Sequence, residues 1–264
     1  MNTAQIPQLS WLLATVVQAL WVFRIWRLGL TRRYPVLFSF LLSTLAFSLI
    51  SVLLIQFNVQ TSAGVNRPLY SWFWVVTQPI MWTLSFCVIV EMYNRILVDF
   101  AGLRRLGQLT MYLASGAVAT LLLSMIFLET SLQTWRRFWF YHEGTVYVGL
   151  TLLCLLLVSF ALFFHLKTPR NVRILFGVFG LIFATQAFMR MLGSEWGDDY
   201  VRLRDLAVPI ISVVCLGVGA FAFSKAGERD GEMAVPKLDP GAETAMATGL
   251  QGFNDVLLKV LRSS

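Results

Sequence analysis

The chain has 264 residues, of which 57% are hydrophobic and only 13% charged; its formal net charge is +7 and its mean hydropathy +0.70. Because an average soluble domain has about 25% charged residues, this chain has too few charges to cover the surface of a water-soluble globule. The composition also excludes a disordered chain and, with three cysteines, a disulfide scaffold, and it predicts a polytopic membrane protein.

Seven apolar runs follow one another along the chain, and we expect each to cross the membrane as a helix. They lie at residues 9–23, 36–57, 69–93, 109–128, 144–165, 174–192 and 206–224. A transmembrane β-barrel would instead show alternating segments of about ten residues, which the sequence lacks. The sequence therefore predicts an all-α fold in which residues 1–224 form a bundle of seven transmembrane helices.

Basic residues flank these runs unevenly. No charged side chain precedes the first run, whereas four arginines follow it at 24–33, which is the reverse of a cleaved signal peptide. Three more arginines lie at 95–105 and three basic residues at 167–173. The loops predicted to lie inside therefore hold ten basic residues, against five in the loops predicted to lie outside. The positive-inside rule then predicts a multi-pass protein of the cell inner membrane, with the amino terminus outside and the carboxyl terminus in the cytoplasm.

The sequence lacks the residues that several kinds of functional site need. The two histidines, His142 and His165, lie near opposite ends of one run, about 35 Å apart along a helix, so they cannot share a metal ion or a haem. Lys167 and Lys225, the lysines nearest the runs, lie at their ends, which excludes a retinal Schiff base deep in the membrane. We therefore expect no cofactor and no metal site, and a membrane enzyme stays only a third hypothesis behind the two given below. The lack of a soluble basic patch also predicts no nucleic-acid partner.

Glu91 is the first of three polar groups that could carry a function. It lies about one turn inside the end of run 69–93, four residues before Arg95, a spacing that favours an ion pair on the helix surface. A structural pair with Arg95, Arg24 or Arg27 is one interpretation. The alternative is a functional acid within the membrane, for example one that couples to proton movement.

Arg190 and the Gln78–Pro79 pair are the other two. Arg190 lies near the outer end of run 174–192, where it could extend to the surface, pair with a carboxylate or contact an anionic ligand; the carboxylates within reach are Glu143, Glu195 and Asp205. Gln78 precedes Pro79 in the middle of run 69–93. A buried amide beside a proline kink can satisfy the broken backbone or bind a ligand. We treat Gln78, Pro79, Glu91 and Arg190 as candidate ligand or transport residues.

The carboxyl-terminal tail divides into two parts. Residues 225–248 are rich in Gly, Pro, Ala and acidic residues, which predicts a flexible cytoplasmic linker. Residues 249–264 regain helical periodicity and predict an amphipathic helix whose apolar face consists of Leu250, Phe253, Leu257, Val260 and Leu261. An isolated helix of this length is only marginally stable in water. We therefore expect it to fold against the membrane surface, a second copy of the chain or a cytoplasmic protein.

These expectations favour a non-enzymatic membrane protein, sensory, signalling or scaffolding in character, that acts through its cytoplasmic tail. The alternative is a small transporter or a carrier of a hydrophobic ligand, which would use Gln78 and Pro79 together with Glu91 or Arg190. The lipid bilayer is the expected partner in both cases.

Overall fold

Helices make up the regular structure of the described residues, and no strand occurs among them. The computed structural model describes residues 5–60, 67–98, 100, 102–105, 108–109, 112, 132–164, 166, 168–192, 197–228, 248–249, 251–252, 254–256 and 259. The elements are α1 (Gln5–Arg27), α2 (Pro35–Gln60), α3 (Arg67–Ile96), α5 (Leu132–Phe163), α6 (Arg170–Leu192), α7 (Gly197–Ala222) and a short 3-10 helix, η1 (Ala226–Glu228).

Four of these helices contain a stretch that is long and apolar enough to cross a membrane: Pro35–Leu54, Phe73–Ile96, Glu143–Phe163 and Arg170–Arg190. A shorter apolar stretch, Ala207–Ala222, lies in α7. The described residues therefore have the structure of an all-helical membrane protein. The predicted run at 109–128 lies outside the described residues except for Leu109 and Tyr112.

Several helices are longer than the apolar runs that predict them. The run at 144–165 corresponds to α5, which begins at Leu132, and the run at 206–224 corresponds to α7, which begins at Gly197. These two runs begin directly after Glu143 and Asp205, but backbone hydrogen bonds continue a helix through polar sequence beyond the hydrocarbon layer. Pro79 and Pro209 both lie inside helices, so neither ends its helix.

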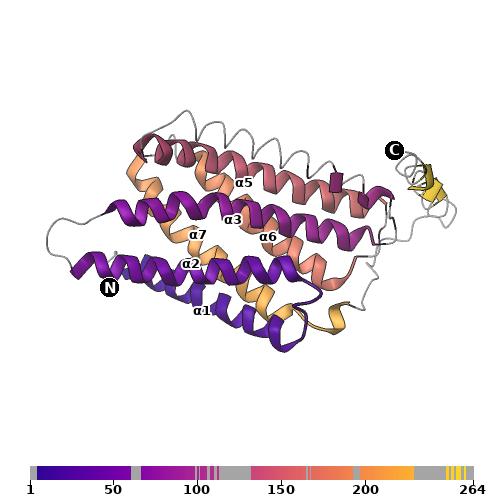
Figure 1. Cartoon of the computed structure of the whole chain (residues 1–264), viewed down its shortest axis with the longest axis horizontal. Coiled ribbons are helices and arrows are strands. Elements are labelled where there is room, and N and C mark those ends of the chain that lie inside the picture. The colour runs from indigo at the N-terminus through magenta and orange to yellow at the C-terminus, as the bar shows by residue number, and fades with distance from the viewer. Residues whose placement is uncertain are drawn as a thin grey trace.

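The six long helices described here form a closed ring. Each helix packs against the next in the order α1, α2, α3, α5, α6 and α7, and α7 packs back against α1; α3 also touches α6 across the ring. In Figure 1 the helices lie side by side along the long axis of the molecule. The ring brings together at one end the carboxyl ends of α1, α3 and α7 and the amino ends of α2 and α6, together with η1. We call this the Glu228 end, after the residue at its centre.

Aromatic side chains fill the interior of the ring. Trp21 on α1 is fully buried, with its ring centroid 6.4 Å from that of Phe179 and 6.2 Å from that of Phe223. Phe179 in turn lies 5.7 Å from Phe183. The close contact between α1 and α7 requires Gly219, because a Cβ atom there would come within 2.5–2.9 Å of the Trp21 ring. These rings leave the centre of the bundle tightly packed.

Candidate functional site

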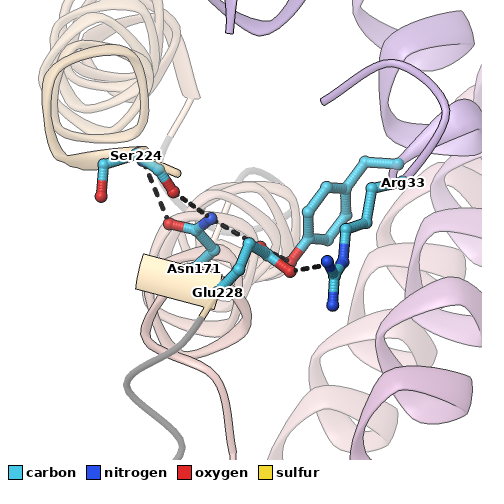
Figure 2. A network of polar contacts seen from close by, with 5 residues as sticks. Arg33, Asn171, Ser224 and Glu228 are labelled. Atoms are coloured by element: carbon cyan, nitrogen blue, oxygen red, sulfur yellow. Dashed lines mark hydrogen bonds and ion pairs between the residues drawn. The ribbon is translucent and has the colours of Figure 1, made fainter. Parts of the chain in front are cut away.

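Glu228 is the centre of a buried polar network (Figure 2). Its Oε1 accepts hydrogen bonds from the Tyr34 hydroxyl at 2.5 Å and from Asn171 Nδ2 at 2.6 Å. Its Oε2 forms an ion pair with Arg33 Nε at 2.9 Å. The Glu228 side chain is only 6% exposed, whereas that of Arg33 is 55% exposed. The carboxylate is thus held by three side chains from two segments far apart in the sequence.

Asn171 joins α6 to the end of α7 in the same network. Its carboxamide is fully buried; Nδ2 also donates to the Ser224 carbonyl at 2.8 Å, and Oδ1 accepts from the Ser224 backbone N–H at 3.2 Å. The Ser224 hydroxyl accepts the Gly227 N–H at 3.0 Å. A Cβ atom at Gly227 would collide with Asn171 Oδ1, so this close approach requires glycine. Asn171 therefore fixes the path of the chain as it leaves α7.

Tyr34 lies in the turn before α2 and is also fully buried. Burial raises the pKa of its hydroxyl above the ordinary range, and so do the hydrogen bond to Glu228 and the charge of Glu228, while Arg95 and Arg33 act in the opposite direction. The hydroxyl therefore stays protonated and remains a donor to Glu228. The Arg95 guanidinium on α3 lies 4.8 Å from the centre of the Tyr34 ring, a cation–π contact that connects α3 to the network.

Asn254 in the tail contacts the segment that follows α3. Its side chain is 3% exposed, and Oδ1 accepts hydrogen bonds from the backbone N–H groups of Gly102 at 2.7 Å and Leu103 at 3.4 Å. Residues 102–105 have helical backbone, so these are N–H groups at the start of a helical turn, which lack partners within the turn itself. Asn is one of the residues preferred for capping such N–H groups, and here the capping Asn lies about 150 residues further along the chain. The tail is thus anchored to the bundle.

The end of α3 connects the tail contact to the Glu228 network. The Tyr93 hydroxyl donates to the Leu103 carbonyl at 2.7 Å, and Gln108 Nε2 donates to Asn94 Oδ1 at 2.8 Å. Arg95, one residue further along α3, contacts Tyr34. A continuous series of contacts therefore runs from the tail through the end of α3 to α2, α6 and α7.

Glu91, predicted to pair with an arginine or to act as an acid, caps α2 and also interacts electrostatically with Arg95 on its own helix. Its carboxylate accepts the backbone N–H groups of Val36 at 3.3 Å and Leu37 at 2.9 Å. Glu91 therefore lies at the Glu228 end, where its hydrogen bonds connect α3 to α2. Arg24, another residue proposed as its partner, donates from Nε to the Phe223 carbonyl at 3.2 Å and so joins α1 to α7.

Arg190 lies at the opposite end of the ring and forms an ion pair with Glu143, one of the three carboxylates considered from the sequence. Arg190 Nη2 lies 2.8 Å from Glu143 Oε2, with the Glu143 side chain 5% and the Arg190 side chain 19% exposed. The pair joins α6 to α5. A Cβ atom at Gly144 would lie 3.1 Å from the Cβ of Arg190, so the two helices approach closely here.

Gln78 lines a cavity between α2 and α3, whereas Pro79 does not. The cavity measures about 170 Å³; its walls include the polar residues Ser48, Ser51 and Thr77 and the aromatic residues Phe47, Phe73 and Trp74. It is separate from Glu91 and Arg190, so the structure does not bring the four candidate residues into one site.

The five tail residues predicted to contact a partner lie outside the described residues: Leu250, Phe253, Leu257, Val260 and Leu261. The sequence reasoning did not identify Tyr34, Asn171, Glu228 or Asn254. Asn171 and Asn254 are polar residues beside apolar segments, but nothing in the sequence names their distant partners. Glu228 stands at the start of the predicted linker, where the structure has the ordered turn η1.

No family model, curated protein or solved structure matches this chain, so its function is inferred from its own residues.

Proposed function

We propose that this protein is a non-enzymatic signalling or scaffolding protein of the cell inner membrane that acts through its carboxyl-terminal tail. It crosses the membrane seven times, the fourth time with the run at 109–128, and has its amino terminus outside. The Glu228 end then faces the cytoplasm, as the excess of basic residues in its loops favours. The tail, on the same side, contacts lipid only at the membrane surface and presents its apolar face to a cytoplasmic protein or a second copy of the chain.

The contact of Asn254 with Gly102 and Leu103 carries this proposal. A tail that only tethered or solubilised the chain would not need a buried carboxamide that satisfies two backbone N–H groups of the bundle. Because that contact continues through α3 to Tyr34 and Glu228, a change in the packing of the helices can alter how firmly the tail is held.

The tail contact can be tested by in-cell photo-crosslinking. A photoreactive amino acid placed at Val256, which is 60% exposed, should crosslink to a cytoplasmic protein or to a second copy of the chain. Asn254→Ala should raise that yield several-fold because the tail is released, whereas the control Asp255→Ala, at an exposed neighbour, should leave it unchanged. Crosslinks to lipid alone, or equal yields in both variants, would contradict the proposal.

The transporter or carrier alternative has one observation in its favour, the cavity lined by Gln78. The packing of Trp21, Phe179 and Phe183 in the centre of the ring disfavours a path through the bundle. The cavity instead lies between two neighbouring helices. It therefore supports binding of a molecule more than its passage across the membrane.

A further inference from the structure

The cavity between α2 and α3 lies within the hydrocarbon layer. Glu91 fixes the alignment of the two helices because it caps α2 at Val36 and Leu37. From that level, Gln78 is 13 residues along α3 and Ser48 is 12 residues beyond Val36 along α2, so both lie about 20 Å further into the bundle at 1.5 Å per residue. A hydrocarbon core is about 30 Å thick, so this depth is past its middle.

Three polar side chains line the cavity at this depth and have no hydrogen-bond partner among the described residues: Ser48, Ser51 and Gln78. Two other hydroxyls of the same cavity are satisfied within their own helices, since Thr44 donates to the Phe40 carbonyl and Thr77 to the Trp74 carbonyl. An amide or hydroxyl left unbonded in hydrocarbon is unfavourable, so these groups favour a partner beyond those that the described residues supply.

The walls of the cavity define the chemistry of that partner. None of the described residues that line it is ionisable, which favours a neutral ligand. Donors on both helices, the Gln78 amide and the two serine hydroxyls, match a molecule with more than one carbonyl oxygen. Phe47, Phe73 and Trp74 offer aromatic surfaces for a flat ring. The volume of about 170 Å³ equals that of about six water molecules at 30 Å³ each, which is room for one ring.

We propose that this cavity binds the head ring of a membrane-dissolved quinone. Gln78 donates to one ring carbonyl and the Ser48 and Ser51 hydroxyls donate to the other, while the aromatic walls contact the ring faces. Most lining residues are half-buried, so the cavity opens at the surface of the helix pair, where an isoprenoid tail extends into lipid. The inference depends on the insertion of α2 and α3 in the membrane and not on the role proposed for the tail.

Quenching of tryptophan fluorescence tests the proposal, because Trp74 forms part of the wall. The full-length protein in lipid nanodiscs is titrated with a benzoquinone that carries one isoprene unit. Saturable quenching is expected, and Trp74→Phe should remove most of it. The triple variant Ser48→Ala, Ser51→Ala, Gln78→Leu should weaken the apparent Kd at least 10-fold. The control pair Ser39→Ala and Thr83→Val removes exposed hydroxyls on the same helices and should leave the Kd unchanged.

Three results would overturn the assignment: no saturable quenching of the native protein, an unchanged Kd in a triple variant whose thermal unfolding matches that of the native protein, or equal competition by a straight-chain alcohol of the same length. The last result would show a site for any acyl chain with one polar group. A triple variant that unfolds early is replaced by Gln78→Leu alone, for which at least a 3-fold weaker Kd is expected. None of these results bears on crosslinking at Val256, so the two proposals fail independently.

Discussion

Glu143 and Arg190 form a charged pair that is largely removed from solvent, at the ends of two spans that the hydropathy of the chain identifies. Two charges taken out of water lose much solvation, and their attraction offsets this loss only while both are present. Removing either partner takes the ion pair from the other charge, which is largely buried. The pair therefore adds little to the free energy of unfolding compared with two neutral residues. The loss of one member alone, however, lowers that free energy strongly.

A double-mutant cycle tests this dependence. Glu143→Gln and Arg190→Gln should each lower the free energy of unfolding by about 3–5 kcal/mol, because each removes the ion pair from a largely buried charge. The double variant should lose less than either single variant, since no charge then remains. Denaturant titration in mixed micelles measures all four proteins. Losses that simply add in the double variant would show that the two side chains act independently.

At the residue scale, the sequence indicates which side chains matter better than it indicates their partners. Arg190 stands out because it is a charge inside an apolar run, and Glu143 is one of the three carboxylates that the sequence places within its reach. Glu91 stands out for the same reason, but its hydrogen-bond partners are backbone N–H groups, which every residue except proline carries and no sequence pattern distinguishes. Asn171 and Glu228, 57 positions apart, meet only because the ring closes, and a single sequence does not contain that information.

At the scale of the element, the start of α2 shows how one helix is capped by another. Pro35 has no backbone N–H and suits the first turn, so Val36 and Leu37 are the N–H groups there that need acceptors. Glu91 on α3 supplies both, and its negative charge also suits the positive end of the α2 dipole. The cap holds the two helices in the alignment that forms the cavity.

Removing this cap should open the first turn of α2 without unfolding the bundle. Glu91→Ala should speed hydrogen exchange at Val36 and Leu37 about 10-fold, which corresponds to about 1.4 kcal/mol, within the range of helix caps. Glu91→Gln keeps one acceptor oxygen and should have a smaller effect. Exchange followed by mass spectrometry on a peptide that covers residues 35–41 measures both variants, with the exposed Thr83→Val as control. Unchanged exchange in Glu91→Ala would mean that the cap contributes nothing to the turn.

The helices themselves were the most predictable feature, because a run of apolar residues without charges has few other ways to satisfy its backbone in lipid. Six of the seven predicted runs coincide with described helices, and the fourth stays a prediction. The starts of α5 and α7 were placed too late because charged residues mark the edge of the membrane and not the end of the helix. The flexible linker predicted at 225–248 does not describe residues 226–228, whose turn is held by Asn171.

At the scale of the whole molecule, the ring has two different ends. The end of the ring near Glu228 is where Arg24, Tyr34, Glu91, Arg95 and Asn171 make their contacts. The described residues of the tail lie beyond the end of the bundle (Figure 1), and Asn254 joins them to it. Signalling through the tail requires that this end face the cytoplasm, so the threading of the chain is the central claim.

Cysteine accessibility in intact cells tests that claim most directly. In a background where Cys87, Cys154 and Cys215 are replaced by Ala, single cysteines are introduced as Asn2→Cys and Ser264→Cys. A membrane-impermeant maleimide should label Asn2→Cys in intact cells and should label Ser264→Cys only after the membrane is opened. Equal labelling of the two variants in intact cells would mean an even number of crossings, and labelling of Ser264→Cys alone would mean the reverse orientation. Either result would contradict a cytoplasmic tail and with it the proposed function.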